Sequence, residues 1–575
     1  MYVKQNVNSA VIGTDDQFMK ILLLSYNDLP HHLRACFLYM AVFPEDYKIR
    51  KSELTKLWVA VGFIKPDRSK SLEAVAEKYV EDLLDRNMIL VYERSYTGKI
   101  KICSIHDLMR DLCVRKAQEE NFLHLYDGRV TYNQRRVSFH SDIYGLHLED
   151  IYVSHVRSLL LITGWNLINE ETSFTRSFLL LRVLDALRIR FYEFPVEIVE
   201  LVNLRFIVLK CIKTCQLPAS ISNLFNLQTL IIYSRDTVKL PSDIWKMPRL
   251  RHIWTWKCFL AYPSAAGNGG KIALLENLRT LKGVIDFKFT KKVLQMIPNL
   301  KKLKIGFGYS SAELSSFSIN KFIHLHQLEY LNCFFQFDSN DPLLVSNPFL
   351  VKSDRDYPLL ENIHFPPTFK RLTLSWKHMA IIGSLPNLEV LNLKRFTFDG
   401  SVWEPNEGNF LQLKVLLLYE TDVEHLKADE TNFPSLQHLI FGDCKQLVEI
   451  PSAIGDTSTL HVIELYKCRS SAVNSVKLIQ DEQRDLGNDN LQIIHDSDML
   501  EIDYRDKFRY GQALVSAVTS GSKIFFIVTD SAPHERTNKE CPCRCARIYN
   551  ALVALSANAK VFEEVISVEI SCFIL

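Results

Sequence analysis

Apolar residues in the middle of the chain recur with a fixed spacing of 23 residues. A leucine, two variable residues and then a leucine or isoleucine form a motif that begins at Leu181, Leu204, Leu227 and Leu250. A proline follows 14 residues after each of the first three leucines, and an isoleucine follows 17 residues after. A short strand with inward apolar side chains, followed by a proline break, explains this pattern. We expect a short strand and a return segment in each unit.

One such unit cannot bury its own apolar face, so neighbouring units must stack. The pattern therefore predicts an α/β leucine-rich-repeat solenoid, a right-handed horseshoe with a parallel sheet on its concave face. In this frame Ile207 and Leu230 are equivalent anchors of neighbouring units, and we expect their side chains to be buried side by side. A leucine-rich α/β domain of another kind is the alternative, but three identical spacings with matched proline and isoleucine positions weigh against it.

Less regular units continue the array toward the C-terminus. Their spacings vary from 19 to 41 residues, and their first anchors are Leu278, Leu300, Leu328, Phe369, Leu388, Leu413, Leu436 and Leu460. The longest insertion, at about 332–368, is rich in Asp, Asn, Ser and Pro and predicts a loop that leaves one face. We count about twelve units between 177 and 470, and place the repeat domain at 177–495.

Residues 18–118 show helical rather than repeat periodicity, with apolar residues at steps of three and four. A hairpin around the turn at 96–98 follows the helical part. Helices followed by a hairpin are the layout of a winged helix, so we expect a mainly α winged-helix domain before the solenoid. The expected elements are a helix through Leu33 to Met40, a helix over Leu54 to Val61 that Gly62 ends, a helix over 72–86, and strands at 89–92 and 99–103.

Three further segments complete the chain. Residues 119–176 carry an apolar alternation at Val137 and an apolar run at Leu159, which predict irregular strands that cap the first repeat. This segment is not rich in Gly, Ser or Pro, so we expect packed structure rather than a flexible linker. Residues 1–17 form an N-terminal extension, and residues 496–575 form a tail of unknown fold.

Cysteines in the tail raise the question of a metal site. Cys541, Cys543 and Cys545 alternate with other residues, whereas structural zinc usually uses pairs with two residues between them. His534 fits no zinc pattern either, so we assign no metal site. The tail is interpreted as a divergent solenoid cap or as a mispredicted end of the gene.

Composition narrows the class of protein. The 575 residues exceed what one compact core can hold, and 47% apolar with 23% charged residues is typical of globular domains. A net charge of +2 gives no bulk attraction for nucleic acid. No stretch reaches the 18 apolar residues of a membrane span, no signal peptide is apparent, and the thirteen cysteines are scattered. We expect a cytoplasmic protein without integral membrane contact, with peripheral membrane association left open.

Three motifs in the helical part carry a family resemblance. Cys36-Phe-Leu-Tyr-Met-Ala-Val-Phe-Pro-Glu-Asp46, Leu57-Trp-Val-Ala-Val-Gly-Phe-Ile64 and Ile105-His106-Asp107 resemble motifs of plant intracellular NB-ARC leucine-rich-repeat disease resistance proteins. Within that family, residues 25–30, 135–139 and 434–439 are most similar to solanaceous late blight resistance protein homologues. The resemblance covers about 18–495.

The family also has a coiled coil and a nucleotide-binding core, and these residues contain neither. The nearest approach to a phosphate-binding loop, Gly267-Asn-Gly-Gly-Lys271, has Ala265 where the first glycine belongs and Ile272 where the hydroxyl belongs. The resemblance is therefore to an N-terminally truncated member. We expect no cofactor in this chain, although the resemblance implies ADP and ATP in intact relatives.

His106 and Asp107 are the candidate nucleotide-binding residues. The resemblance implies that the histidine contacts the β-phosphate of ADP and holds the inactive state. Residues 104–107 precede an apolar run, so we place His106 in the first turn of a helix, where backbone N–H groups attract anions. The alternative is a capping box of Ser104 and Asp107 that only fixes the helix start.

Aromatic residues at the variable strand positions are the candidate protein-recognition surface. Trp254 lies one position after a second anchor, and Tyr233, Trp256, Tyr419 and Tyr466 lie three positions after one. These positions face the concave side, and exposed aromatic residues on a rigid surface are typical interface anchors. Singly exposed aromatic residues are also normal, which is the alternative interpretation.

The resemblance implies a fragment of a plant immune receptor. Its repeats would recognise a pathogen effector or a guarded host protein and regulate an ADP/ATP switch that triggers defence and the hypersensitive response. The alternatives are a switch-less adaptor or regulatory decoy that meets full-length relatives, or the product of a truncated gene. No nucleophile, base or metal cluster has catalytic spacing, so we expect no enzyme, no catalytic residue and no nucleic-acid partner.

Overall fold

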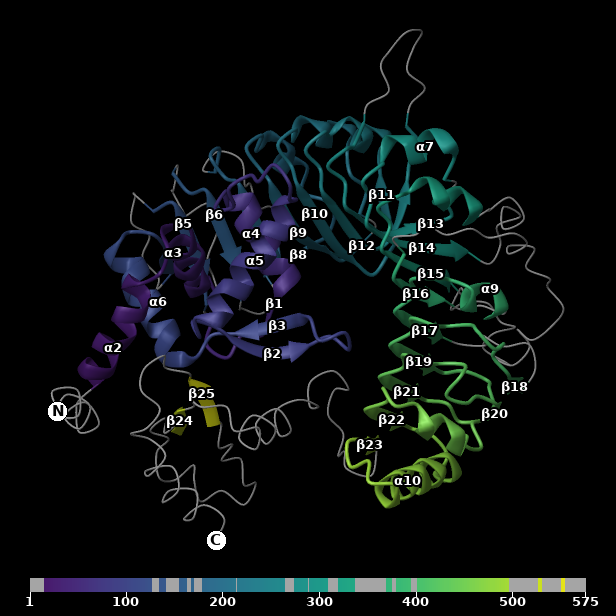
Figure 1. Ribbon diagram of the computed structural model, residues 1–575. Coiled ribbons are helices and arrows are strands. Elements are labelled where there is room, and N and C mark those ends of the chain that lie inside the picture. Colours follow the sequence, from purple (N-terminus) through teal and green to yellow (C-terminus); the bar gives the residue numbers. More distant parts are fainter. Residues whose placement is uncertain are drawn as a thin grey trace, which may run out of the picture. The chain divides into compact units, whose positions relative to one another are not determined.

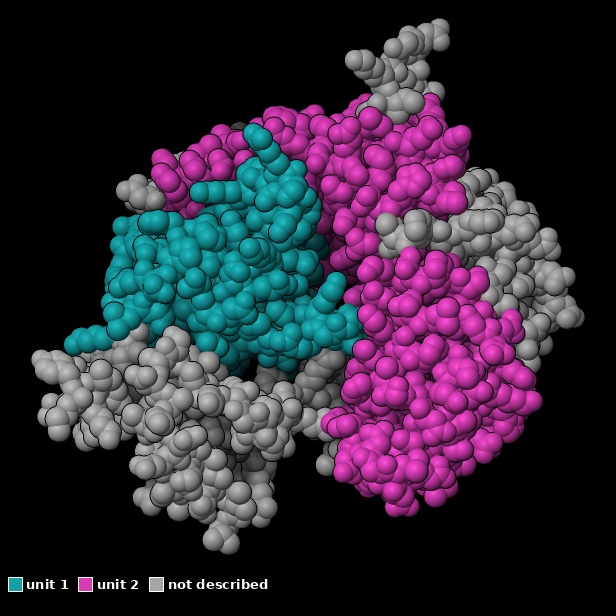
Figure 2. All heavy atoms as spheres, in the orientation of Figure 1, with its two compact units in different colours: residues 1–123, 501–575 teal, residues 124–500 magenta. Residues whose placement is uncertain are grey.

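The chain forms two compact units in the computed structural model (Figure 1). One unit comprises Met1–Leu123 with Glu501–Leu575, and the other comprises His124–Leu500 (Figure 2). We call them the helical unit and the repeat array. The described residues are 15–126, 134–140, 155–162, 167–169, 178–213, 215–263, 274–287, 289–308, 319–336, 369–374, 379–394, 401–495, 526–529 and 550–553.

The helical unit has the expected winged-helix layout. Strands β2 and β3 form an antiparallel hairpin, and β1 pairs with the other edge of β3. At the hairpin turn Gly98 adopts a φ of 73° and donates to the Ser95 carbonyl at 2.8 Å. The elements are α2 (Asp15–Asn27), α3 (His31–Leu38), η1 (Tyr39–Val42), β1 (Ile49–Arg50), α4 (Lys51–Val61), α5 (Leu72–Asp85), β2 (Leu90–Arg94), β3 (Ile100–Ser104) and α6 (Asp107–Glu119).

Local sequence signals explain where these helices begin and end. Gly62 ends α4 in the left-handed region, with φ of 96°, and donates to the Trp58 carbonyl at 3.1 Å. Ser71 starts α5 by accepting the Ala74 amide at 3.3 Å. The helix expected through Met40 ends earlier, at Leu38, and continues as the 3₁₀ turn η1.

The repeat array is built on one succession of parallel strands. Each pairs in parallel with the next, and the short strands β7 (Leu167–Asn169) and β11 (Val238–Leu240) pair beside β8 and β12. The succession is β4 (His124–Tyr126), β5 (Arg136–Phe139), β6 (Ser158–Leu161), β8 (Val183–Phe191), β9 (Phe206–Cys211), β10 (Thr229–Ser234), β12 (His252–Leu260), β13 (Thr280–Ile285), β14 (Lys302–Gly308), β15 (Tyr330–Gln336), β16 (Arg371–Leu374), β17 (Val390–Lys394), β19 (Val415–Tyr419), β21 (His438–Gly442), β22 (Val462–Tyr466) and β23 (Gln492–His495).

Short helical turns connect these strands. A proline directly precedes each of η3, η4 and η5, as the 23-residue pattern predicts. The connecting elements are η3 (Val196–Glu200), η4 (Ala219–Asn223), η5 (Ser242–Lys246), α7 (Lys291–Met296), η7 (Ile319–His324), α9 (Met379–Gly383), η9 (Ser452–Asp456), α10 (Ser470–Asp485) and a second parallel pair, β18 (Val402–Trp403) with β20 (His425–Leu426). In the described residues no helix has the length and apolar character that a bilayer crossing requires.

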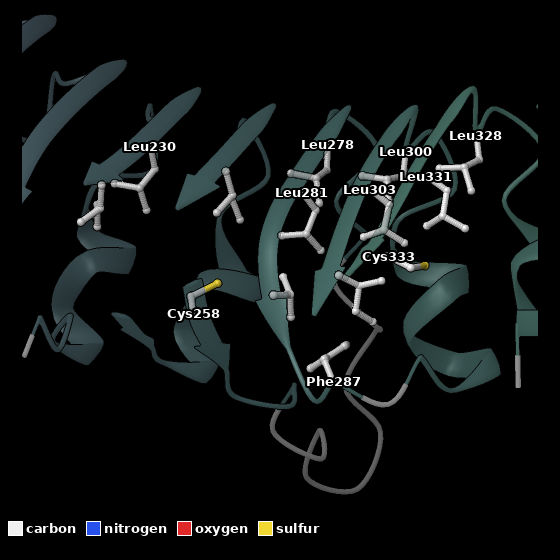
Figure 3. Packing of buried hydrophobic residues seen from close by; sticks show 14 of the residues in the cluster. Leu230, Cys258, Leu278, Leu281, Phe287, Leu300, Leu303, Leu328, Leu331 and Cys333 are labelled. Atoms are coloured by element: carbon white, nitrogen blue, oxygen red, sulfur yellow. The ribbon is translucent and has the colours of Figure 1, made fainter. Parts of the chain in front are cut away.

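The repeat register follows the leucine spacing. Leu184 pairs with Ile207, Ile207 with Leu230 and Leu230 with Ile253, so residues 23 apart lie side by side. All four side chains are buried. The same core position continues through Leu281, Leu303 and Leu331 (Figure 3). The predicted repeat frame, with Ile207 buried beside Leu230, is confirmed.

The strands before the first regular repeat differ from the expectation. Val137 pairs with Leu159 and Leu159 with Leu184, so β5 and β6 occupy the same register as the regular repeats. They are strands of the same parallel sheet, with a more regular register than expected, and their capping role stays a prediction. The register is regular because Val137, Leu159 and Leu184 are equivalent anchors of one apolar core.

Several predictions fall on residues that the structure does not describe. These are the extension up to residue 14, the loop around Gly267, most of the insertion at 332–368, and the tail cysteines with His534. Residues 332–336 of that insertion are the end of β15 rather than a loop.

A column of asparagines joins neighbouring repeats by hydrogen bonds. We did not predict it from the sequence. Asn203, Asn226, Asn277 and Asn299 each precede a first leucine anchor. Their amides donate to main-chain carbonyls of the preceding repeat at 3.0, 3.1, 2.9 and 2.9 Å. Each bond satisfies a turn carbonyl that the strands leave unpaired.

Candidate functional site

His106 lies directly before helix α6 in the structure. It is the N-cap residue, with φ of −68° and ψ of 144°, and its Nδ1 accepts the Leu108 amide at 3.3 Å. Ser104 is the last residue of β3 and pairs with Leu90 of β2. The predicted capping box of Ser104 and Asp107 is therefore wrong, because strand pairing holds Ser104 outside the helix. Likewise, His106 precedes the first helical turn instead of lying within it.

The capping bond fixes the chemistry of the His106 ring. A neutral imidazole that accepts a hydrogen bond at Nδ1 carries its hydrogen on Nε2 and can donate from there. Asp107 follows in the first turn, where its negative charge is favourable to the helix dipole. Whether these two residues contact a nucleotide stays a prediction.

Helix α6 also joins the motif segments that carry the family resemblance. Arg110 donates from Nε to the Phe43 carbonyl at 3.1 Å, and the Cys113 thiol donates to the Phe37 carbonyl at 3.2 Å. These bonds hold the start of α6 against the Cys36–Asp46 segment. Burial raises the pKa of the Cys113 thiol well above its ordinary value, so this side chain is a packed donor rather than a reactive group.

Three of the predicted recognition residues lie together on neighbouring strands. The Tyr233 ring of β10 and the Trp254 ring of β12 are 4.5 Å apart between centroids, tilted by 57°. Trp256, two residues further along β12, is 56% exposed. The structure therefore gathers Tyr233, Trp254 and Trp256 into one group, which we call the aromatic patch.

Lysines that the sequence interpretation missed extend the aromatic patch. The Lys304 ammonium lies 5.1 Å from the Trp256 ring centroid, and Lys282 lies 5.6 Å from that of Tyr330. Lys282 pairs with Trp254 and Lys304 pairs with Lys282 in the sheet register. Each lysine comes one position after a second anchor, as Trp254 does. This shared position could have identified the lysines from the sequence. The patch can offer aromatic faces and positive charge at once.

Tyr419 and Tyr466 lie in a separate group, on β19 and β22. Both pair with Gly442 of the intervening strand β21. A Cβ atom at Gly442 would approach the Tyr419 Cδ2 atom to 2.5 Å, so the Tyr419 ring packs against this glycine. Tyr466 donates to Glu464 at 2.7 Å. The five predicted aromatic residues thus form two groups on the array.

Among the described residues, no three His, Cys, Asp or Glu side chains gather as metal ligands would. Nine cysteines lie in this part of the chain, and all are free thiols. Burial raises the pKa of Cys103 and Cys258 to about 12, which is typical of packed thiols.

Known family models match one segment of each unit. Residues 42–113 match the model of the disease resistance protein winged helix domain, and residues 155–366 match that of a leucine-rich repeat region. A putative late blight resistance protein homologue from Solanum demissum is 31% identical over 507 residues. A late blight resistance protein of the same species is 33% identical over 500 residues. Each match covers 82% of this chain and 37% of the relative, so the chain spans well under half the length of these relatives.

Two solved structures match at low identity. The leucine-rich-repeat ectodomain of a plant membrane receptor kinase from Arabidopsis thaliana is 15% identical, with a TM-score of 0.36, covering 59% of this chain and 39% of that one. A leucine-rich-repeat protein of Leptospira interrogans is 18% identical, with a TM-score of 0.34, covering 66% and 98%. On the sequence matches, the chain carries the winged-helix domain of disease resistance proteins followed by a leucine-rich repeat region, and over 82% of its length it is similar to late blight resistance proteins.

Proposed function

We propose that this chain serves plant disease resistance as the sensing part of an immune receptor. In this proposal the repeat array recognises a pathogen effector or a guarded host protein, and its role is recognition rather than catalysis. The winged-helix match, the repeat match and the similarity to late blight resistance proteins over 82% of the chain support it. The cytoplasm is the proposed location, because the resemblance is to intracellular receptors.

The single observation that carries the recognition role is the aromatic patch. Trp256 exposes a large apolar ring on a rigid strand, and rings of this kind anchor protein interfaces. The Tyr233 and Trp254 rings lie against each other beside it, so a partner meets a prearranged surface. Such preorganisation lowers the entropic cost of binding.

In an intact receptor the helical unit would report the state of a nucleotide switch. We propose that His106 donates from Nε2 to the β-phosphate of ADP, since its Nδ1 is taken by the Leu108 amide. Replacement of ADP by ATP would break this contact and permit the defence response and hypersensitive cell death. The chain itself carries no Gly-x-x-x-x-Gly-Lys-Ser/Thr loop, so we expect the nucleotide to need residues beyond those present.

Recognition can be tested by co-expressing the chain with a library of pathogen effectors in leaves and measuring pairing by split luciferase. Trp256→Ala should abolish pairing with the recognised effector. Phe259→Ala is the matched control, because Phe259 lies on the same strand β12 and is 48% exposed. A recognised effector that treats both variants alike would contradict the role of the aromatic patch.

Defence output separates the receptor fragment from a switch-less adaptor or regulatory decoy, and calorimetry tests whether this chain holds a nucleotide. Calorimetry of the purified chain with ADP and with ATP should show no binding, because the phosphate-binding lysine and hydroxyl are absent from these residues. Micromolar affinity would contradict this expectation. A chain that pairs with its partner in leaves without any defence output would favour the adaptor.

A further inference from the structure

The turns that follow strands β19, β21 and β22 share one backbone conformation. Glu420, Asp443 and Lys467 each come directly after their strand, and their φ angles of 53°, 52° and 52° lie in the left-handed region. The last residues of the three strands pair in register, and the strands are neighbours in the sheet (Figure 1). The same backbone in the same register directs the next side chain the same way in each repeat.

Thr421, Cys444 and Cys468 are the residues that follow these turns. The Thr421 hydroxyl oxygen and the Cys444 sulfur are 3.3 Å apart, and the Cys468 thiol hydrogen-bonds to the Cys444 sulfur. Both sulfurs also lie near the end of β21. The Cys444 sulfur is 3.5 Å from the Gly442 carbonyl oxygen, and the Cys468 sulfur is 3.7 Å from the Phe441 carbonyl oxygen. The three side chains form a ladder whose last two members are a pair of thiols.

The backbone spacing at this thiol pair suits a disulfide. The Asp443 amide donates to the Tyr466 carbonyl at 2.7 Å, so the two repeats are still hydrogen-bonded one residue before Cys444. Neighbouring strands lie about 4.8 Å apart, and disulfides join residues whose Cα atoms are about 4.4–6.8 Å apart. Thiols at the same position of neighbouring repeats therefore need little backbone movement to become linked.

Cys468 differs from the other cysteines in the described part of the chain. It is half-buried, whereas the other eight are buried. A second thiol pair, Cys211 with Cys215, has its sulfurs 3.2 Å apart, but these residues are only 2% and 0% exposed. A small oxidant can therefore reach the pair of Cys444 and Cys468 from solvent, while the pair of Cys211 and Cys215 lies inside the core.

We propose that Cys444 and Cys468 are a redox modification site, at which a peroxide forms a reversible disulfide between two neighbouring repeats. Hydrogen bonds from the Cys468 thiol and then from the Thr421 hydroxyl outweigh burial and lower the pKa of Cys444 to about 7. The hydrogen bond to Cys444, followed by burial, raises the pKa of Cys468. The pair therefore holds one thiolate and one thiol near neutral pH. This inference goes beyond the proposed function and does not depend on it.

The reaction needs one peroxide molecule and no other co-reactant. Proton transfer along the hydrogen bond between the sulfurs places the thiolate on the half-buried Cys468. The thiolate attacks a peroxide oxygen, the O–O bond breaks, and the leaving hydroxide takes a proton to become water, which leaves a sulfenic acid. The second sulfur attacks the sulfenic sulfur, and the hydroxyl group leaves as water with the proton of the second thiol. The two thiols lose two electrons, and hydrogen peroxide is reduced to two waters.

The disulfide would stiffen two neighbouring repeats. Each repeat of a stack is held only by its neighbours, so a covalent bond between two turns should slow their local opening. Helix α10 begins at Ser470, two residues after Cys468, so its first turn should be stiffened as well. Two molecules of reduced glutathione would reverse the change by thiol–disulfide exchange and become glutathione disulfide.

Hydrogen peroxide treatment of the purified full chain tests the site. Free thiols are then blocked with iodoacetamide, the chain is digested with pepsin without reduction, and mass spectrometry identifies the linked peptides. We expect a link between Cys444 and Cys468 at a yield about tenfold above that between Cys211 and Cys215, because only the first pair is accessible. Reduced glutathione should restore both thiols.

Cys468→Ser and Cys211→Ser are matched variants, because each removes one sulfur from one pair. Oxidation should raise the unfolding temperature of the parent and of Cys211→Ser, and it should leave that of Cys468→Ser unchanged. Hydrogen exchange of the oxidised parent should become slower in β21, β22 and the start of α10. Exchange in β9 and β10 should stay as it is in the reduced chain.

Three results would overturn the inference. Cys444 and Cys468 could both remain free under peroxide that already oxidises methionines, Cys468 could link to a cysteine other than Cys444, or the link could form only in urea. The first shows an unreactive pair, the second a wrong partner, and the third a folded array that keeps the oxidant out. Each removes the redox site and leaves the proposed effector recognition standing, because that recognition is tested separately by Trp256→Ala.

Discussion

The helical unit and the repeat array bury their apolar residues in different ways. Large aromatic side chains fill the interior of the helical unit, where Phe37, Tyr39, Phe43 and Trp58 are all almost completely buried. The array instead has a single elongated core that runs from Val137 to Leu491 and is dominated by leucine and isoleucine. One unit is a compact cluster, and the other is a stack.

This difference predicts how each unit responds to damage. In a compact cluster every element contacts the same few side chains, so losing one of them weakens the whole unit. In a stack each repeat contacts only its neighbours, so stability is close to a sum of local terms. The comparison therefore separates global from local loss of structure, and each prediction below tests it.

Trp58→Ala should give the largest loss. Its side chain is fully buried, and truncating a buried tryptophan costs about 3–5 kcal/mol. The Trp58 Nε1 atom has no hydrogen-bond partner, so the cost comes from packing alone. Hydrogen exchange followed by mass spectrometry should show lost protection in α3, α4, α5 and α6 together, with the array unchanged. Trp256→Ala, which truncates an exposed tryptophan, is the control. Lost protection confined to α4 would contradict a single shared core.

Leu230→Ala should cost roughly 2–5 kcal/mol, since its side chain is fully buried between Ile207 and Ile253. The same exchange measurement should show lost protection in β9, β10 and β12, with distant repeats such as β21 and β22 retained. Leu411→Ala, at a leucine that is 53% exposed, should leave exchange unchanged. Uniform loss along the whole array would show that the stack behaves as one cooperative cluster.

Asn226→Ala tests the fastening between repeats. The Asn226 amide donates to the Val202 carbonyl at 3.1 Å, and its oxygen accepts from Arg249 at 2.6 Å. Both bonds are near solvent, so we expect a loss of about 1 kcal/mol. Chemical denaturation measures it, with Asn223→Ala, at an exposed position of the same repeat, as the control. Equal denaturation midpoints for the two variants would show that the asparagine column does not stabilise the stack.

The sequence predicted the repeat frame because the apolar period is a direct consequence of stacking. It predicted less where the period varies. The anchors Val137, Leu159 and Leu184 are 22 and 25 residues apart, which breaks the 23-residue spacing, yet they share one register. The motif Val156-Arg-Ser-Leu159 keeps the anchor pattern and was the available signal. The connecting segments differ in length, so the sequence spacing does not show that these anchors occupy equivalent positions in the sheet.

The local structure of the candidate site could not be predicted from the sequence where it depends on pairing between distant segments. The pattern Ser104-Ile-His-Asp107 fits a capping box on sequence alone, but pairing with Leu90 holds Ser104 in a strand. His106 therefore caps the helix in its place. The aromatic residues were identifiable from their strand positions. Their division into two groups depends on which repeats are neighbours. The two lysines can be assigned to the aromatic patch only from their contacts with the rings.

Gly442→Ala should give the smallest loss and sharpens the comparison within the array itself. The added Cβ would meet the ring of Tyr419, which is 41% exposed and can swing toward solvent. We therefore expect a change below about 0.5 kcal/mol in unfolding free energy. Gly455→Ala is the matched case in a connecting turn, since its Cβ would meet the Ile479 Cγ2 atom at 2.6 Å in the buried core, and overpacking there costs about 1–3 kcal/mol.

Thermal unfolding of the two variants measures the contrast. Because Gly442→Ala displaces Tyr419 without harming the core, it also separates the second aromatic group from stability. If Tyr419 anchors the partner, effector pairing falls while the unfolding temperature holds. A large loss of stability in Gly442→Ala would mean that the exposed ring is held as tightly as a core side chain, and the local character of the stack would then not extend to its concave surface.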